Sequence, residues 1–430
     1  MKRVLIIVYY WPPSAGSGVQ RWLNFSKYLT KFDWQPVVYT PENPDFELQD
    51  ESLLASINPE VEVIKQPIWE PYQLHKLISG KQSESSKTAG VVDTNKSYWS
   101  NWIRGNVFVP DPKVFWRKPS VKFLKSYLQE NPVEAIISSG TPHSMHLIAL
   151  DLKQSFPTVP WITDFRDPWT ELDMLESYHI LPLRMKRYRK LEKKVLQAAD
   201  LSLTTSKVWA DDFKRLGARK TMAITNGYDE EDFKGEVKPY DEFVVSHFGL
   251  LNHLRNPEQL WQALSELIEE NQAFSEQFRL HLGGTLDPRI LDQIKRYPNL
   301  AEKLKVFPYL SHREVVAEYR KSSLLLLLLF NSKSGRGNIP GKLFEYLASK
   351  KTILAFGSSK GDAAEIVAKT KNGIYFNYGE ATVSKLKRTL LDCFEKWQSG
   401  QLDQPAIDVS QYSRRKLTQK LSETLNQLTA

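Results

Sequence analysis

Lys342 and Glu345 are two charged residues whose spacing suggests chemistry, in the segment NSKSGRGNIPGKLFEYLASKKTILA. We expect a buried strand to end at Phe330 and a short helix to begin near Pro340, after a loop rich in Gly, Ser and Lys. Residues three apart share one helix face. The lysine, in the first turn, can bind phosphate, and the carboxylate can accept hydrogen bonds from ribose hydroxyls. A surface ion pair is the simpler alternative, which the position of the loop after a strand disfavours.

Arg255 is a second candidate for binding phosphate. It follows a strand that ends in glycine, in HFGLLNHLRNPEQL, and it precedes a helix. A guanidinium group there can hold a diphosphate through paired hydrogen bonds. The alternative is a solvated arginine, and it is slightly disfavoured because a cation is unfavourable near a helix N-terminus unless an anion is present.

The first half of the chain opens with a glycine loop, WPPSAGSGVQRW, between a strand and a helix. Gly16 and Gly18 would allow backbone to approach a ligand, and the helix N-terminus offers free N–H groups. The dinucleotide fingerprint G-x-G-x-x-G is not complete, because Arg21 stands at its third position. A tight turn without a ligand explains the two glycines equally well.

Four polar residues follow two further strands in the first half. His143 lies in SSGTPHSMH, and Asp164, Arg166 and Asp167 lie in WITDFRDPW. The carboxyl ends of parallel strands are where ligands bind in open sheets. We therefore expect the three charged residues to orient sugar hydroxyls or an acceptor. The alternatives are a structural or capping histidine and an ion pair that shapes the loop.

These residues must be positioned by alternating strands and helices. Strands are expected at residues 3–10, 36–40, 61–64, 134–139, 161–163, 201–206, 243–249, 279–284, 305–310, 324–330, 352–357 and 373–377. Helical patterns fill the gaps between the strands, for example at residues 18–31, 143–155, 183–198, 257–278 and 381–397. This alternation is typical of parallel sheets covered on both faces. Twelve strands exceed one typical open sheet, so two α/β domains are predicted.

Two irregular stretches interrupt the pattern. The acidic, helix-poor residues 228–242 mark the seam between domains, and residues 80–97 read as a mobile insert in the first domain. The insert leads into YWSNWIRGNVFVPDPKVFWRKP, where aromatic residues alternate with cations. This segment is either a loop pinned by its aromatic side chains or a surface for sugars or a membrane interface.

Charge and composition limit the partners. The 430 residues carry a net charge of +8, and Cys393 is the single cysteine, which excludes a disulfide framework. Residues 183–194, LRMKRYRKLEKK, form a basic amphipathic helix, which is either a solvated face or a patch for an anionic membrane. Nucleic acid is a minor alternative without a motif. The apolar residues 3–10 and 324–330 read as buried strands, so we expect a cytoplasmic protein, soluble or peripheral at the inner membrane face.

Several motifs together resemble family-4 glycosyltransferases. TNGYDEEDF at 225–233 is similar to the N-G-x-D-x-x-x-F element that closes the family's N-terminal domain. IPGKLFEYLASKKTILA looks like its nucleotide-binding helix, with Glu345 at the ribose-binding position. YYWPPSAGSGVQRW resembles its first glycine loop, and TDFRDPW resembles a pattern of a polysaccharide-biosynthesis branch. The matches span nearly the whole chain in the expected order.

The resemblance implies a GT-B fold of the α/β class: two Rossmann-like, doubly wound domains that face a cleft, and a C-terminal helix that crosses back to the first domain. The domains would be residues 1–230 and 241–405, with the crossing helix in 406–430. It implies retaining transfer from a UDP- or GDP-linked sugar to a glycan or lipid-linked acceptor, without a metal or cofactor. The expected catalytic residues are His143, Asp164, Arg166 and Asp167. The expected donor-binding residues are Gly16, Gly18, Arg255, Asn338, Gly341, Lys342 and Glu345.

Two positions depart from the family pattern. Gly337 stands where the family usually has a second glutamate, and Leu250 stands where it often has an arginine. The sugar contact would then fall to Asn338 or to backbone N–H groups. A catalytically degenerate partner subunit, a nucleotide-sugar epimerase and a nicotinamide-dependent oxidoreductase therefore remain alternatives, the last disfavoured by the incomplete fingerprint.

Overall fold

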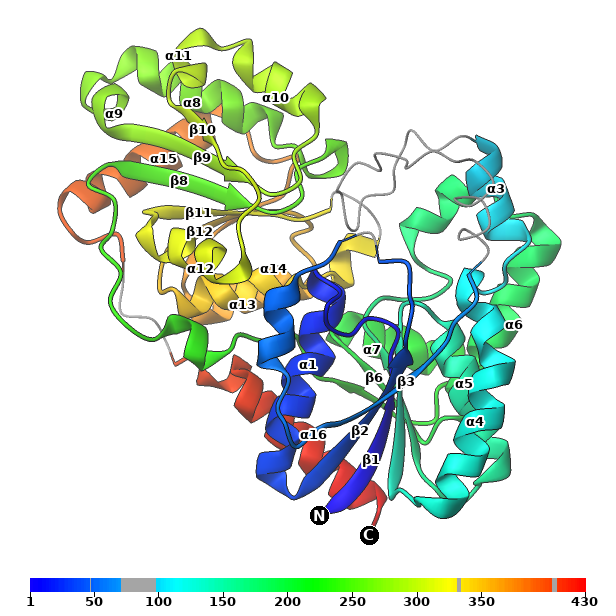
Figure 1. The fold of residues 1–430 in the computed structure, drawn as a ribbon. Helices are drawn as coiled ribbons and strands as arrows, with labels where there is room; N and C mark the ends of the chain where they lie inside the picture. Colours follow the sequence, from blue (N-terminus) through cyan, green and yellow to red (C-terminus); the bar gives the residue numbers. More distant parts are fainter. Residues whose placement is uncertain (47, 71–97, 331–333, 404–407) are drawn as a thin grey trace. The chain divides into compact units, whose positions relative to one another are not determined.

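The computed structural model describes residues 1–46, 48–70, 98–330, 334–403 and 408–430, and these form two compact units (Figure 1). The first unit contains Met1–Thr225 together with Arg414–Ala430, and the second contains Asn226–Ser413. The expected seam at 228–242 thus lies at the start of the second unit. The expected insert at 80–97 lies outside the described residues.

The described part of the first unit is a seven-stranded parallel sheet covered by helices on both faces. The strand order is β3-β2-β1-β4-β5-β6-β7. The strands are β1 (Lys2–Ile7), β2 (Trp34–Pro41), β3 (Glu62–Gln66), β4 (Ala135–Gly140), β5 (Trp161–Phe165), β6 (Leu201–Thr204) and β7 (Thr221–Ala223). The main helices are α1 (Ser17–Leu29), α3 (Tyr98–Asn106), α4 (Arg117–Glu130), α5 (Ser144–Ser155), α6 (Pro182–Ala198), α7 (Lys207–Leu216) and α16 (Arg414–Leu428).

The described part of the second unit repeats this plan with six parallel strands in the order β10-β9-β8-β11-β12-β13. The strands are β8 (Phe243–Phe248), β9 (Phe278–Gly283), β10 (Leu304–Val306), β11 (Leu324–Leu328), β12 (Thr352–Phe356) and β13 (Gly373–Phe376). The helices are α8 (Glu258–Glu270), α9 (Gln272–Gln277), α10 (Pro288–Lys295), α11 (Pro298–Ala301), α12 (His312–Lys321), α13 (Gly341–Ala348), α14 (Asp362–Thr370) and α15 (Val383–Gln398).

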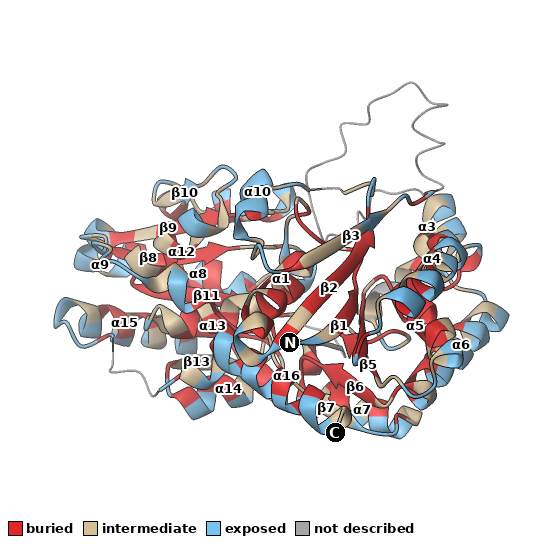
Figure 2. Ribbon diagram, turned by 60° about the horizontal axis from the view of Figure 1, so that its bottom comes forward, coloured by how far each residue is buried: buried red, intermediate tan, exposed pale blue. Residues whose placement is uncertain are grey.

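The central strands of each sheet are buried on both faces because they are apolar without alternation, whereas the edge strands β3, β7, β10 and β13 are only partly buried. In β1, Leu5 and Ile7 enter one hydrophobic core, while Val4 and Ile6 enter another on the opposite face. Successive residues of a strand point to opposite faces, so a strand between two helix layers must be apolar throughout. Figure 2 shows the result: central strands such as β1 and β2 are mainly buried, the edge strand β3 is mostly intermediate, and exposure is confined mainly to loops and outer helix faces.

Both strand orders reverse once, and these reversals position the candidate sites. In the first unit the order changes direction between β1 and β4, and in the second between β8 and β11. Connections from neighbouring strands leave in opposite directions there and open a crevice at the carboxyl ends of the strands, where open α/β sheets bind ligands. The segments after β8 and after β11 are the two that carry Arg255 and Lys342.

The C-terminal helix α16 returns to the first unit, as the resemblance implied. Its apolar residues Leu417, Leu421 and Leu425 are buried in the same core as Trp22 and Phe25 of α1. The chain therefore passes from the first unit into the second and back, so folding of the first unit requires both ends of the sequence.

All the expected strands are present, and the structure adds one strand, β7. One of the expected helices is divided into two. The short strand β7 was not predicted, because its three residues TMA carry no apolar run. The predicted helix 257–278 is divided at Asn271, whose side chain accepts a hydrogen bond from the backbone N–H of Phe274 and so begins α9. Within the described residues, we find no helix with the length and hydrophobicity needed to cross a bilayer.

Candidate functional site

Lys342 lies in the first turn of α13, at the strand-order reversal of the second unit. Its Nζ atom donates a hydrogen bond to the carbonyl oxygen of Phe248, the last residue of β8, at 3.0 Å. Gly249 follows, and a Cβ atom at this position would overlap Nζ of Lys342. The pKa of Lys342 is lowered to about 7, mainly by burial and secondly by the nearby Arg255, while Glu345 opposes the shift. An anion bound here would relieve the repulsion between the two cations.

Arg255 ends the short 3-10 helix His253–Arg255 that follows β8. Its guanidinium lies 3.8 Å from the ring centroid of Phe330, and its buried Nε atom has no hydrogen-bond partner among the described residues. Burial lowers the pKa of Arg255 to about 10, which the hydroxyl of Tyr378 opposes. A buried donor without a partner costs free energy, so this arginine can meet an acceptor that the described residues do not supply.

The N-terminus of α13 adds to the positive potential. The helix begins after Pro340, whose side chain provides no cap, and its first turn contains no acidic residue. The first backbone N–H groups of a helix lack intrahelical partners and carry a partial positive charge. Neither Arg255 nor Lys342 forms an ion pair with a described carboxylate. Two cations and a helix N-terminus together are suited to a diphosphate.

Glu345 lies one turn after Lys342 and is the acidic side chain of this site. Its side chain is 17% exposed, and its Oε1 atom lies 3.7 Å from Nε2 of His312, at the start of α12. His312 also contacts Asp232 at 3.2 Å. Glu345 thus retains an accessible carboxylate edge, which can accept hydrogen bonds from vicinal hydroxyl groups.

Two glycines line this site that the sequence reasoning did not single out. Gly284, after β9, has a φ of 94°, and a Cβ atom there would lie 2.7 Å from the carbonyl oxygen of Gly249. The backbone N–H of Gly249 donates to the carbonyl of Gly283 at 2.8 Å. Side chains are therefore excluded at both loops. The signal in the sequence was that both strands end in glycine, HFG and LGG.

The remaining expected donor residues lie in the segment before α13. The N–H of Asn338 donates to the carbonyl of Gly335 at 3.2 Å, and the backbone of Gly341 is open, with no atom within 4 Å of a Cβ built there. Gly337 is buried in the short helix Ser334–Gly337. Leu250 has an apolar side chain and so offers no cation at this position; its carbonyl oxygen lies 3.4 Å from Nε2 of His247.

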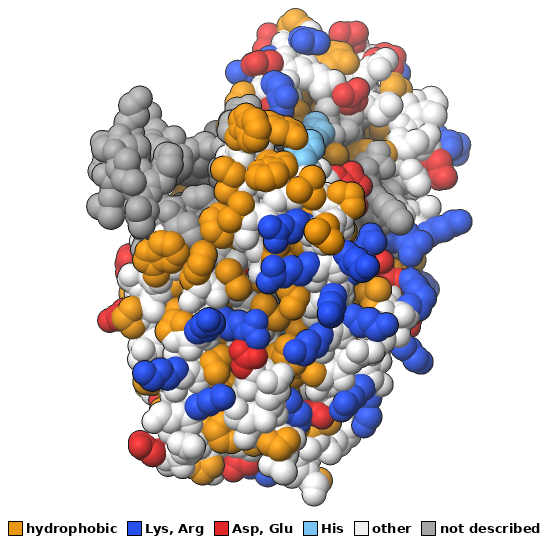
Figure 3. Space-filling view, turned by 90° about the vertical axis from the view of Figure 1, so that its right-hand side faces the viewer, with side chains coloured by type: hydrophobic (Ala, Val, Ile, Leu, Met, Phe, Trp, Pro, Cys, Tyr) orange, Lys and Arg blue, Asp and Glu red, His pale blue; other side chains and the backbone are white. Residues whose placement is uncertain are grey.

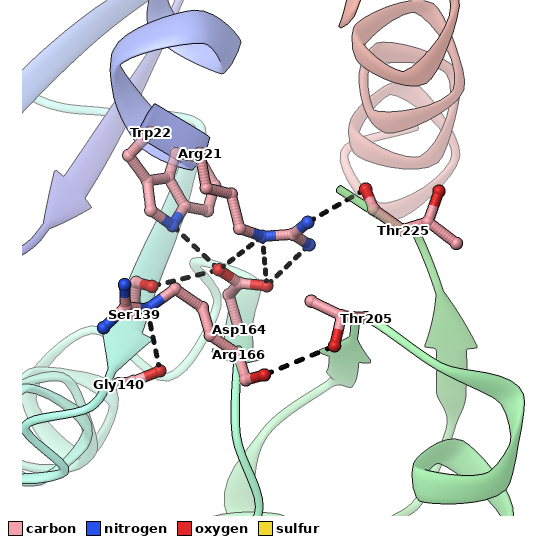
Figure 4. A network of polar contacts seen from close by, with 8 residues as sticks. All are labelled: Arg21, Trp22, Ser139, Gly140, Asp164, Arg166, Thr205 and Thr225. Atoms are coloured by element: carbon pink, nitrogen blue, oxygen red, sulfur yellow. Dashed lines mark hydrogen bonds and ion pairs between the residues drawn. The ribbon is translucent and has the colours of Figure 1, made fainter. Parts of the chain in front are cut away.

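Asp164 is the centre of a buried polar network in the first unit (Figure 4). Both its side chain and that of Arg21 are essentially unexposed, at 0% and 1%, and they form an ion pair at 2.8 Å. The carboxylate also accepts hydrogen bonds from Trp22 Nε1 at 2.8 Å and from Ser139 Oγ at 3.0 Å. Asp164 therefore joins β5 to α1 and β4, and its oxygens are occupied by protein donors.

Arg166 belongs to the group of residues drawn in Figure 4 but forms no ion pair with either flanking aspartate, contrary to the alternative considered from the sequence. Its Nη2 donates to the carbonyl of Thr141 at 2.6 Å, and its guanidinium lies 5.6 Å from the ring centroid of Tyr10. A Cβ atom on Gly18 would come within 2.9 Å of Nη1 of Arg166. The structure thus brings Gly18 and Arg166 together, and it explains why a side chain is excluded at residue 18. Gly16 caps α1 with a φ of 88°.

Asp167 follows Arg166 and has no hydrogen-bond partner among the described residues. Burial raises the pKa of Asp167, the Arg166 guanidinium opposes the shift, and the carboxylate of Asp164 adds to it. A half-buried carboxylate with a raised pKa and unoccupied oxygens can bind a hydroxyl group or accept its proton.

His143 is buried against Trp169, with parallel rings whose centroids are 4.6 Å apart. Burial lowers its pKa well below the ordinary value, and His146 and Arg166 lower it further, so the imidazole is neutral. Its Nδ1 atom has no partner in the described part of the chain and faces Gly140, where a Cβ atom would lie 2.8 Å away. His143 therefore lies with Arg166 at the carboxyl ends of β4 and β5, beneath the surface.

No protein-family model and no curated protein sequence matches the chain. Solved structures share its fold. Alr3699/HepE of Anabaena in complex with UDP-glucose is 15% identical, with a TM-score of 0.63 over 99% of this chain and 100% of that one. A protein assigned as a UDP-N-acetylglucosamine 2-epimerase from Listeria monocytogenes is 11% identical (TM-score 0.56; 97% and 94%). WaaG, a glycosyltransferase involved in lipopolysaccharide biosynthesis, is 10% identical (TM-score 0.54; 99% and 97%). The chain has the GT-B fold of such enzymes.

Proposed function

We propose that this protein is a glycosyltransferase that moves a sugar from a nucleoside diphosphate to a glycan or lipid-linked acceptor. The main supporting observation is the pair of cations at the β8/β11 reversal, Arg255 and Lys342, which form no ion pair with a described carboxylate. Lys342 is close to Arg255 and also to Glu345. A nucleoside diphosphate supplies both the anion that the cations lack and the ribose hydroxyls that Glu345 can bind. The UDP-glucose complex of a protein with the same fold supports this donor class.

In the proposed reaction, the bond between the sugar C1 and the diphosphate oxygen breaks, and a bond from C1 to the acceptor oxygen forms. The acceptor proton moves to the leaving diphosphate. Negative charge grows on the diphosphate in the transition state, so Arg255, Lys342 and the N-terminus of α13 would stabilise it without a metal ion. Retention of configuration at C1 is part of the proposal and is supported by the resemblance to family-4 enzymes.

The first unit would bind the acceptor. Asp167 and Arg166 are the charged side chains there with capacity for a ligand, whereas Asp164 would act by holding β5 against α1. Gly16 and Gly18 would bring the N-terminus of α1 toward the sugar. The side-chain amide of Asn338 and the backbone N–H of Gly341, the first residue of α13, would contribute donors at the diphosphate and sugar, since the usual glutamate is replaced by Gly337.

We assign the activity to the cytoplasm, in the synthesis of a cell-surface polysaccharide, with the protein peripheral to an anionic membrane. The basic residues 183–194 support the membrane location. The shared fold with WaaG, a glycosyltransferase of lipopolysaccharide biosynthesis, supports the pathway class.

The test is a thermal-shift panel of UDP, GDP, ADP, CMP and NAD on wild type, Glu345→Ala and the control Glu380→Ala. A ligand at a hundred times its dissociation constant stabilises the folded state by about 2.7 kcal/mol. We expect one nucleoside diphosphate to raise the melting temperature of wild type and of the control but not of Glu345→Ala. The proposed donor site would be refuted if NAD alone raised the melting temperature, or if none of the nucleoside diphosphates did.

An epimerase acting on a nucleotide sugar is a second candidate, favoured by the fold shared with the Listeria protein. Product analysis separates the two, because an epimerase returns an isomeric nucleotide sugar, whereas a transferase releases the nucleoside diphosphate. A degenerate partner subunit, suggested by Gly337 and Leu250, would bind the nucleotide without releasing either product.

A further inference from the structure

The first unit exposes apolar side chains at the N-terminal ends of two helices. In α3, Trp99 is 68% exposed and Tyr98 is 55% exposed. At the start of α6, Leu183 is 79% exposed and Leu181 is 47% exposed. Exposed tryptophan and leucine side chains that are grouped together indicate a surface that binds a membrane or another protein.

Direct contacts join these two groups into one surface. The backbone N–H of Leu181 donates to Oδ1 of Asn106, at the end of α3, at 2.8 Å. The ring of Tyr98 lies 4.7 Å from that of His179, which precedes α6. The hydroxyl of Tyr188, inside α6, donates to the carbonyl of Gly105 at 3.1 Å. The two helices therefore form a single surface, named here the α3/α6 face.

The α6 part of this face is positively charged and has no acidic partner in the described part of the chain. The helix carries seven cations: Arg184, Lys186, Arg187, Arg189, Lys190, Lys193 and Lys194. Its single acid, Glu192, is 2% exposed and accepts hydrogen bonds from Thr170. None of the seven forms an ion pair with a described residue. Solvated helices usually interleave Glu with Lys, so an all-cationic face indicates an anionic partner.

Charge and apolar character lie on the same side of α6. Counting from Leu183, the positions three, seven and ten residues later are Lys186, Lys190 and Lys193, which share one helix face. The buried residues of α6, such as Tyr188 and Val195, lie on the other side. Figure 3 shows hydrophobic side chains gathered over the upper part of this view, with Lys and Arg side chains spread below and few acidic ones.

We propose that the α3/α6 face docks on an anionic lipid bilayer. Tryptophan, tyrosine and leucine side chains are favourable at the boundary between headgroups and acyl chains. The cations below them are complementary to anionic headgroups. A second copy of the chain would bring like charges together, and a nucleic acid would leave the exposed Trp99 and Leu183 without a role. An anionic lipid surface is complementary both to the apolar side chains and to the cations of the α3/α6 face.

The proposed function includes a peripheral membrane location, and the α3/α6 face is the surface that would make this contact. The inference rests on the proposed function only for the biological role of the docking. The face would hold the first unit where a lipid-linked acceptor is presented. Vesicle binding requires neither donor nor acceptor, so its failure and the failure of the transferase proposal are distinguishable.

The experiment is co-sedimentation of the full chain with phosphatidylcholine vesicles that contain or lack phosphatidylglycerol. Each cation near an anionic surface strengthens binding by about fivefold. Lys186→Gln/Lys190→Gln/Lys193→Gln should therefore weaken binding by about a hundredfold, and Trp99→Ala/Leu183→Ser should also weaken it. Two controls outside the face should bind as wild type: Lys295→Gln/Arg296→Gln/Lys385→Gln, exposed cations of the second unit, for charge and Leu54→Ser for apolar exposure. Melting temperatures verify that every variant is folded.

Three results would overturn the proposal. Equal binding to both vesicle types would exclude the role of charge, and equal loss in the control variants would exclude the role of this face. Absence of vesicle binding would also overturn it. Binding of a DNA duplex would then assign the face to nucleic acid, and dimers in light scattering would assign it to a second copy of the chain.

Discussion

The ammonium group of Lys342 occupies the space that a side chain on Gly249 would need. The same ammonium donates to the carbonyl of Phe248 at 3.0 Å, so the lysine is held against the loop that follows β8. This contact joins the two segments that the strand order brings together, one after β8 and one after β11. The glycine and the lysine thus act as one structural unit.

Replacing Gly249 should therefore disturb ligand binding through Lys342. In Gly249→Ala the new methyl group would displace the ammonium, and we expect affinity for the bound nucleoside diphosphate to fall by about tenfold or more, because a charge-assisted hydrogen bond is worth about 1.5–3 kcal/mol. Isothermal titration measures this. Gly379→Ala is the matched control, since the nearest atom to a Cβ there is Oδ1 of Asn377 at 3.8 Å, an ordinary contact. Equal affinity in both variants would contradict the prediction.

The pKa of Lys342 predicts how binding depends on pH. It is lowered from 10.5 to about 7, so the folded state disfavours the charged lysine. Below pH 7 this cost is fully present, and stability gains from this group as pH rises from about 7 to 10.5. An anion favours the charged form, so binding above pH 7 should take up a proton. Titration at about pH 8 in two buffers of different ionisation enthalpy detects this uptake. Lys342→Met should abolish it, and the exposed-site control Lys360→Met should not.

The buried pair of Arg21 and Asp164 should stabilise the first unit without serving the donor site. Asp164→Ala leaves a buried guanidinium without its partner, which costs about 3–5 kcal/mol. Urea unfolding measures this loss. Asp212→Ala, which removes a surface pair with Arg215, should cost less than about 1 kcal/mol. Variants of Asp164 that retain full stability would contradict the structural role assigned to it.

Asp167 should affect transfer and not donor binding. Its carboxylate has no described hydrogen-bond partner, and its pKa is raised by burial, so Asp167→Asn keeps the shape and removes the charge. We expect the transfer rate to fall about a hundredfold or more, as for loss of a positioned acid or base. Nucleotide affinity in the same samples should change less than twofold. Asp211→Asn, at an exposed position of α7, is the control, and an equal fall in that variant would remove Asp167 from the site.

Gly284 should be required for stability. Its φ of 94° and the backbone of Gly249 within 2.9 Å of a Cβ atom leave no room for a side chain. Gly284→Ala should destabilise the second unit by about 1–3 kcal/mol, through backbone strain and overpacking. Gly400→Ala separates the two causes, because Gly400 has a φ of 68° and no atom near a Cβ. Gly400→Ala should lose only the stability that backbone strain costs. An equal loss of stability in the two variants would contradict the packing argument.

The local pattern of the sequence was sufficient for the elements and for part of the site. Apolar runs of five to eight residues predicted strands such as β1 and β11, because a strand between helix layers must be apolar on both sides. The spacing of Lys342 and Glu345 placed them on one face of α13, because helix periodicity depends only on neighbouring residues. These inferences required no knowledge of distant segments.

Tertiary structure alone decided which distant residues meet. Asp164 pairs with Arg21, 143 residues away, and not with the adjacent Arg166. Arg255 lies over Phe330, and Gly284 approaches Gly249. Such contacts follow from strand order, which hydrophobic periodicity does not encode. The local sequence therefore determines where the helices and strands form, while the order of the parallel strands in the sheets determines which residues the buried charges contact.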